Sequence, residues 1–307
     1  MHSPHPSRNC PQILRPALAT AEAVLAGACH RAGVDHTGAR LVQLVGNAVF
    51  QLARAPIFVK IILNAGLRYR AENSVAAARL LADHGVPAVR LAPVACAQPV
   101  HLYGCTVTFW KRVPQAGPPA GSGELAKLLT QLHTIPTDPS LRRWDPIADL
   151  RARIAAAADI NVEQQRWLRS RCERLAEDLT GMRYRLPRAV IHGDARPANL
   201  INTRTGPVVC DLDTVCVGPA EWDLVPMAVG ALRFRGHHAA YRELVDLYGY
   251  DVTTWGGFAT LRRVRELKLV AVAVPMAAGN PRIHSQLRHR LRTLREGADA
   301  AWWTPYR

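Results

Sequence analysis

The sequence predicts an α+β fold with a small, β-rich N-terminal lobe and a larger, mostly helical C-terminal lobe. Residues 41–63 contain short apolar runs separated by turn residues, a pattern typical of a twisted sheet. Proline and glycine are concentrated in residues 114–123, which predicts a linker. Behind the linker, helical patterns occur in residues 237–248, 258–278 and 283–296.

A chain of 307 residues is long enough for one large domain or for two lobes with a sizeable core. The apolar spacing after residue 16 predicts a leading helix over residues 17–32. The expected parts are a disordered tail (1–16), the N-terminal lobe with its leading helix (17–113), the linker (114–123) and the C-terminal lobe (124–307).

Composition narrows the function classes. No apolar run reaches the length of a membrane span, so no membrane partner is expected. The seven cysteines include no C-x-x-C pair, which argues against a disulfide framework and a structural zinc site and favours the cytoplasm. The net charge of +15 comes almost entirely from arginines spread along the chain. Because they are not clustered with aromatic residues, no nucleic-acid partner is expected.

The segment His192-Gly193-Asp194-Ala195-Arg196-Pro197-Ala198-Asn199, followed by Asp211-Leu212-Asp213, carries the strongest motif. Protein kinases have H-R-D-x-x-x-x-N followed by D-F-G, where the first Asp meets the attacking hydroxyl and the Asn and second Asp hold magnesium. Here Asp194 and Asn199 have that spacing, and Asp211 follows twelve residues later. Gly193 replaces the kinase arginine, and Leu212-Asp213 replaces Phe-Gly.

The flanks of this motif predict strands. Residues 188–191 form a short apolar run, and a hairpin turn at residues 203–206 separates two further apolar runs. Such a hairpin would carry Asn199 and Asp211 at adjacent strand ends, where their oxygens could bind Mg²⁺. A polar turn with chance Asp and Asn residues is the alternative. Three suitable residues at kinase spacing favour the phosphoryl-transfer interpretation.

Lys60 is the candidate phosphate ligand of the N-terminal lobe. It interrupts the apolar run Ile57–Leu63 and is the only lysine among the first 110 residues. Kinases use a strand lysine to hold the α- and β-phosphates. A solvent-facing strand lysine is the alternative interpretation. The turn at Gly46-Asn47 would cover the phosphates, although it contains little glycine.

Glu72 lies in a helix predicted over residues 67–84 and is the expected ion-pair partner of Lys60. The alternative is an exposed acid in the first turn of that helix, stabilised by the helix dipole. A strand is expected to begin at residues 86–89 and another to cover residues 106–113. The end of the latter would meet the purine, which makes Trp110 and Lys111 nucleotide-binding candidates.

The chain resembles the aminoglycoside phosphotransferase family, which includes choline kinase-like small-molecule kinases, from about residue 40 to residue 300. The resemblance is carried by Phe58-Val59-Lys60-Ile61, His84-Gly85-Val86-Pro87, the His192 to Asp211 motif, and Gly218-Pro219-Ala220-Glu221-Trp222-Asp223-Leu224. It implies a bilobal protein-kinase-like fold. It also implies Mg²⁺, ATP or GTP as the donor, and transfer of the γ-phosphoryl group to a hydroxyl of a small molecule.

The resemblance also implies roles for single residues. Asp194 would be the catalytic base, and Asn199 and Asp211 would bind Mg²⁺. His192 would support the catalytic loop, and Asp223 would accept hydrogen bonds from the loop backbone. An N-cap of the helix beginning near Leu224 is a second role open to Asp223. Two roles are open for Asp213: it could face the acceptor site, or it could support Arg196.

The identity of the acceptor is constrained by charge. A polycationic aminoglycoside needs an acidic pocket, and this chain is strongly basic. A neutral or anionic hydroxylated metabolite or antibiotic is therefore expected. Asp246 and Glu266 are candidate contacts of the acceptor, and a solvated helix charge is the alternative interpretation of each. The main alternative function is a nucleotide-binding pseudokinase with a regulatory or scaffold role. A monomer or homodimer is expected, with the aromatic C-terminal residues 302–306 docked on the core.

Overall fold

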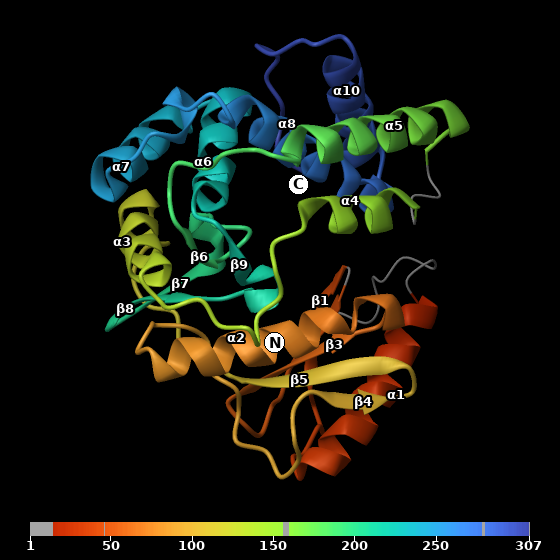
Figure 1. The fold of residues 1–307 in the computed structure, drawn as a ribbon. Helices are drawn as coiled ribbons and strands as arrows, with labels where there is room; N and C mark the ends of the chain where they lie inside the picture. The colour runs from red at the N-terminus through yellow and green to blue at the C-terminus, as the bar shows by residue number, and fades with distance from the viewer. Residues whose placement is uncertain (1–14, 46, 156–159, 278–279, 307) are drawn as a thin grey trace. The chain divides into compact units, whose positions relative to one another are not determined.

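The computed structural model describes residues 15–45, 47–155, 160–277 and 280–306, shown in Figure 1. The chain forms two compact units. The first contains Met1–Pro118 and Ile201–Val215, and the second contains Pro119–Leu200 and Cys216–Arg307. Most of the predicted tail lies outside the described residues, whereas Arg15 and Pro16 already belong to the first helix.

The first unit is built on a five-stranded antiparallel sheet with strand order β1-β2-β3-β5-β4 (Figure 1). The predicted sheet over residues 41–63 is confirmed by its first three strands. The elements are α1 (Arg15–Ala32), β1 (Arg40–Val45), β2 (Asn47–Gln51), β3 (Ile57–Ile62), the 3₁₀ turn η3 (Ala65–Leu67), α2 (Tyr69–Asp83), β4 (Val100–Leu102) and β5 (Cys105–Lys111).

Helix α1 covers one face of this sheet, which confirms the expected leading helix. Its buried side chains, including Val24 and Leu25, share a core with Val59 and Ile61 of β3. Side chains alternate between the two faces of a strand, so Lys60 belongs to the face opposite this core.

Residues 201–215 belong to the first unit, which corrects their assignment to the C-terminal lobe. They contain most of the predicted hairpin, β7 (Leu200–Thr203) and β8 (Gly206–Val209), and the 3₁₀ turn η5 (Leu212–Thr214). The backbone of Val209 explains this placement, because it donates to the Pro87 carbonyl and accepts from the Val89 amide.

The strand predicted from residue 86 is wrong. Ala88 forms only an isolated bridge, to Val209, and the remaining strand of the sheet is β4. Pro87 has no backbone N–H and cannot donate to a strand ladder. The backbone around it therefore bonds to the hairpin through the Pro87 carbonyl and the Val89 amide.

The second unit is mostly helical and holds one two-stranded antiparallel sheet, β6-β9 (Figure 1). Its elements are α3 (Ser122–His133), α4 (Pro146–Ala155), α5 (Val162–Leu179), β6 (Arg188–Ile191), η4 (Pro197–Asn199), β9 (Cys216–Pro219), α6 (Glu221–Arg233), α7 (His238–Tyr248), η6 (Val252–Thr254), α8 (Phe258–Ala271), α9 (Val274–Ala277) and α10 (Pro281–Arg295). The helix expected over residues 258–278 is divided into α8 and α9. Pro275 cannot donate a backbone hydrogen bond to Ala271, where α8 ends.

The aromatic C-terminal residues dock on the second unit, as expected. Trp303 is buried, its amide donates to the Arg233 carbonyl and its indole N–H donates to Thr293. Glu266, a candidate acceptor contact, instead pairs with Arg233 at 2.7 Å in the interior. Asp246, the other candidate, lies on the exposed side of α7. Among the described helices, none is long and apolar enough to cross a membrane.

Candidate active site

The catalytic-loop segment of the second unit follows β6, and a carboxylate from α6 holds its first residues. Asp223 has no exposed surface, and its two oxygens accept from the amides of His192 at 2.6 Å and Gly193 at 2.7 Å. His133 Nε2 lies 3.2 Å from the same carboxylate. The N-cap of α6 is Ala220, so the alternative role of Asp223 as a cap is wrong.

The loop needs glycine at position 193. Gly193 has a φ of 79°, in the left-handed region that side chains with a Cβ rarely adopt. Its carbonyl accepts from the indole N–H of the buried Trp222 at 2.9 Å. The arginine of the protein-kinase motif would be strained at this position.

Asp194 follows at the turn of the loop. Its carbonyl accepts from Asn199 Nδ2 at 2.8 Å, and its amide lies 3.3 Å from His192 Nδ1. These two bonds close the loop around the residue that carries the candidate base. Asn199 is buried, and its amide nitrogen faces a carbonyl, so the side-chain oxygen is the atom suited to bind a cation.

Positive side chains surround the Asp194 carboxylate. Arg265 Nη1 of α8 lies 2.6 Å from Oδ1, and Arg196 Nε lies 3.5 Å from Oδ2. Burial alone would raise the pKa of the carboxyl, but the charges of Arg265, Lys268 and Arg196 outweigh burial and hold that pKa well below its usual range. Asp194 is therefore ionised at neutral pH and can accept a hydrogen bond from a hydroxyl.

The first unit holds a second charged cluster, built around Lys60. Lys60 Nζ donates to Asp213 Oδ1 at 2.7 Å and Oδ2 at 2.8 Å, and lies 3.4 Å from Asp211 Oδ1. Burial alone would lower the pKa of the Lys60 ammonium, but the charges of the two aspartates outweigh burial and raise that pKa. Lys60 is therefore a positive charge at neutral pH.

Helix α2 contributes to this cluster through Ser74 and Asn73. Ser74 Oγ donates to Asp213 Oδ1 at 2.7 Å. Asn73 Nδ2 donates to the carbonyls of Asp213 at 3.2 Å and Val215 at 2.6 Å. The helix thus fixes both the side chain of Asp213 and the turn that carries it.

Glu72 does not pair with Lys60, so that prediction is wrong. It lies in the first turn of α2, half exposed, beside Arg68 at 3.5 Å and His101 at 4.0 Å. A helix turns about 100° per residue, so the side presenting Asn73 and Ser74 to the cluster turns Glu72 away. The two roles left open for Asp213 are also replaced, because its carboxylate pairs with Lys60.

The remaining nucleotide-binding candidates differ in their surroundings. Gly46 lies outside the described residues. Trp110 is buried, and its indole N–H donates to Thr108 at 2.8 Å. The Lys111 side chain is exposed, but its amide donates to the Arg90 carbonyl at 2.8 Å and is not available to a purine.

Each unit offers an oxygen donor of the type that a magnesium ion prefers. Asp211 is half exposed and has a φ of 58°, a left-handed conformation uncommon for a residue other than glycine. Such conformations concentrate at functional sites, where they aim a side chain. Asp211 and Asn199 both offer oxygen, the ligand type that Mg²⁺ prefers. In the part of the chain that is described, no group of three or more His, Cys, Asp or Glu residues suits a metal.

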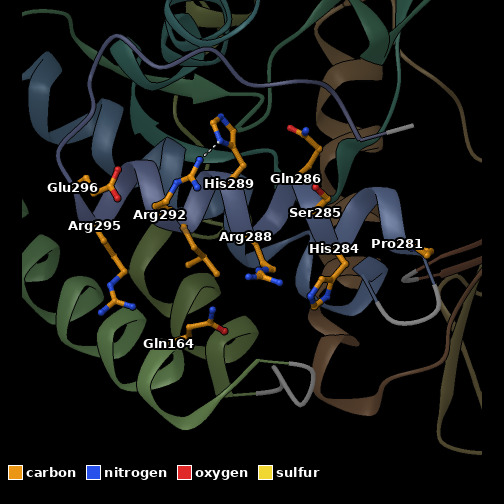
Figure 2. Close-up of a pocket in the computed structure, with 11 residues that line it drawn as sticks. Gln164, Pro281, His284, Ser285, Gln286, Arg288, His289, Arg292, Arg295 and Glu296 are labelled. Atoms are coloured by element: carbon orange, nitrogen blue, oxygen red, sulfur yellow. Dashed lines mark hydrogen bonds between the residues drawn. The ribbon is translucent and has the colours of Figure 1, made fainter.

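A large cavity of the second unit lies elsewhere, between α5 and α10. Figure 2 shows His284, Arg288 and Arg295 extending from α10 toward the helix that carries Gln164. Its volume is about 940 Å³, and none of the catalytic-loop residues line it. Its wall is strongly basic, but no residue of α8 lines it either, so it is not the site around Asp194.

Arg265 and Lys268 are not among the residues expected from the sequence, and the pairing of Asp213 with Lys60 is not expected either. Arg265 and Lys268 are three residues apart in α8 and therefore share a helix face. A signal was present, since Lys268 is one of only four lysines and stands in an apolar stretch. Glu72 is the only acid between Asp35 and Asp83, so the sequence favours Glu72 rather than Asp213 as the partner of Lys60.

Comparison with known proteins identifies the family. Residues 43–267 match the model of the phosphotransferase enzyme family. The chain belongs to that family. No curated protein matches the chain. Among solved structures, many match this phosphotransferase, and the three described below share 11–16% sequence identity with it.

An amicoumacin kinase in complex with AMP-PNP, Ca²⁺ and Ami matches with a TM-score of 0.67 and 11% identity, over 91% of this chain and 94% of that chain. A spectinomycin phosphotransferase with ADP and spectinomycin has a TM-score of 0.60 and 15% identity, over 90% and 93%. A choline/ethanolamine kinase family protein from Mesorhizobium loti has a TM-score of 0.56 and 16% identity, over 89% and 94%. These likenesses confirm the predicted protein-kinase-like α+β fold.

Proposed function

We propose that this phosphotransferase moves the γ-phosphoryl group of ATP or GTP to a hydroxyl of a small molecule, a metabolite or an antibiotic, in the cytoplasm. The observation that carries the proposal is the ordered catalytic loop. Asp223 fixes the amides of His192 and Gly193, and the loop presents an ionised Asp194. The complexes of the spectinomycin phosphotransferase and the amicoumacin kinase with nucleotide and antibiotic support this reaction class.

The proposed mechanism is direct in-line transfer. Asp194 accepts a hydrogen bond from the acceptor hydroxyl, orients it, and takes its proton late in the reaction. Because the pKa of Asp194 is lowered, the carboxylate is a weak base, and orientation is its larger contribution. Phosphoryl transfer depends mainly on positioning and electrostatic stabilisation, so a weak base suffices.

The donor phosphates are assigned to Lys60, with Mg²⁺ held by Asn199 and Asp211. Bound Mg²⁺ would neutralise phosphate charge, as it does in other phosphoryl-transfer enzymes. In the first unit, Lys60 is kept protonated by Asp213 and Asp211. Asp213, which would keep its own bond to Lys60, positions the ammonium for the phosphates.

The test is nucleoside diphosphate release in the presence of Mg²⁺, measured with both ATP and GTP. The acceptor panel contains hydroxylated antibiotics, nucleosides, sugars, hydroxy acids and amino alcohols. We expect at least one acceptor to give turnover that Asp194→Ala removes. Nucleotide binding without turnover in any arm would instead favour a pseudokinase with a regulatory or scaffold role.

A further inference from the structure

Three cationic side chains act on the carboxylate of the candidate base, Asp194. Arg265 and Arg196 contact the Asp194 oxygens, and Lys268 acts on Asp194 through its charge. Within the described residues, Lys268 has no carboxylate partner, and its ammonium lies 6.0 Å from the centre of the Trp222 ring. Asp149 and Arg153, which pair with each other, act on Lys268 through opposite charges. Positive charge therefore exceeds negative charge around the base.

Arg265 has more donors than Asp194 uses. It is 6% exposed, and its Nε has no hydrogen-bond partner in the structure. A buried guanidinium N–H without an acceptor is costly, so an additional negative oxygen beside Arg265 would stabilise the site. Lys268 also indicates that an additional negative group would stabilise the site. Burial lowers the pKa of its ammonium, and the charge of Asp194 only partly opposes that effect.

From these observations we infer that the acceptor is an alcohol bearing a carboxylate or phosphate group, which Arg265, Lys268 and Arg196 bind while its hydroxyl meets Asp194. The inference rests on the proposed function, because it names the substrate class of the same site. Arg265 is hydrogen-bonded to the base itself, so the acceptor's hydroxyl and its anionic group are a few bonds apart. A polycation would instead add positive charge to a site that already has an excess.

The reaction balances without a further reactant. The acceptor oxygen forms a bond to the γ-phosphorus as the bond to the β-phosphate oxygen breaks. The hydroxyl proton passes to Asp194 and then to solvent, and the nucleoside diphosphate leaves. The anionic group of the acceptor takes no part in bond making, so its contribution appears in binding and orientation.

The test uses matched acceptors that differ in one group. Glycerol, glycerate, glycerol 3-phosphate and 3-aminopropane-1,2-diol form one set, and glucose, gluconate and glucosamine form another. We expect nucleoside diphosphate release with an anionic member and much weaker release with its neutral and cationic analogues. The carboxylate and phosphate arms show which anion the site prefers.

Substitutions test which side chains bind the anionic group of the acceptor. Lys268→Met removes the charge while keeping an unbranched side chain, and we expect it to raise KM for the anionic acceptor by about 10- to 100-fold. KM for the nucleotide should stay near the wild-type value. Arg263→Gln is the matched control, because Arg263 is an exposed cation on the same helix. Arg265→Gln should lower kcat as well, since Arg265 also positions Asp194.

The outcomes separate this inference from the proposed function. Preference for a neutral or cationic analogue overturns the inference and leaves the phosphotransferase intact. Equal effects of Lys268→Met and Arg263→Gln also overturn it. If no acceptor is turned over, calorimetric titration with glycerate, gluconate and glycerol 3-phosphate decides. Saturable binding weakened by Lys268→Met supports the anion site, and no binding of any of the three overturns it.

Discussion

Lys60 and Asp213 form a two-point ion pair, with Nζ 2.7 Å from Oδ1 and 2.8 Å from Oδ2. Ser74 donates to the same carboxylate, so the pair is anchored to α2 without its glutamate. The helix acid of protein kinases is thus replaced by an acid two residues after Asp211. This relationship separates the roles of Asp213 and Glu72 in a way that substitution can measure.

Asp213→Asn is expected to raise KM for the nucleotide by about tenfold or more, because Lys60 loses a charged hydrogen-bond partner. Glu72→Gln is the matched control and should leave that KM nearly unchanged, since among the described residues Glu72 forms ion pairs with Arg68 and His101 and not with Lys60. Steady-state kinetics at saturating acceptor provide the measurement. A larger effect from Glu72→Gln than from Asp213→Asn would contradict the assignment.

Asp194→Ala is expected to lower kcat by about 10²- to 10⁴-fold, the usual contribution of a positioned base. Nucleotide affinity should remain close to that of the wild type. Single-turnover kinetics and equilibrium titration with a nucleotide analogue measure the two quantities separately. Nearly full activity in this variant would refute the role of Asp194.

Asp211→Asn is expected to weaken Mg²⁺-dependent nucleotide binding, because a neutral amide is a poorer ligand for a hard cation than a carboxylate. Titration of nucleotide with and without EDTA tests this expectation. The wild type should lose affinity when EDTA is added, whereas the variant should respond much less. The same Mg²⁺ dependence in both proteins would exclude Asp211 as a ligand.

Asp223→Ala is expected to destabilise the fold and to abolish turnover, since two buried amides of the loop lose their acceptor. Each buried N–H without a partner costs about 1–3 kcal/mol. Asp223→Asn retains one acceptor oxygen and should be less destabilised. Urea unfolding of the three proteins gives the order, and a variant as stable as the wild type would show that the loop finds other partners.

Arg233→Met is expected to lower the free energy of unfolding by about 3–5 kcal/mol, the usual cost of breaking a buried ion pair. Arg233 contacts Glu266 and donates to the carbonyls of Ala298 and Ala301. Arg235→Met serves as a nearby control, because Arg235 lies outside this buried pair. Chemical denaturation measures both, and equal stabilities would contradict the importance of the pair.

Much of the fold was predictable because the relevant signals are local. Lys60 interrupts an apolar run, and Asp194 and Asn199 keep a fixed spacing, so both are visible without a structure. The partner of Lys60 was not predictable in this way. It depends on how α2 is rotated and on where residues 201–215 pack, and neither follows from local pattern.

The same reason explains why Arg265 was missed. It is separated from Asp194 by 71 positions, and its neighbour Glu266 drew attention as the acid of the segment. In the structure, Glu266 forms an ion pair with Arg233 in the interior, and it is Arg265 that contacts the candidate base Asp194. Which of two adjacent charges faces a site depends on tertiary packing rather than on charge alone.

The chain passes between its two units at Pro118–Pro119, Leu200–Ile201 and Val215–Cys216, so neither unit is one continuous stretch. A gene truncated after Pro118 would encode the five-stranded sheet with Lys60 but without Asp211 and Asp213. The lysine would then lack both of its carboxylate partners. A chimera that exchanges the first unit between relatives must therefore exchange two separate segments of the sequence, and a recombinant with a single junction is expected to fail.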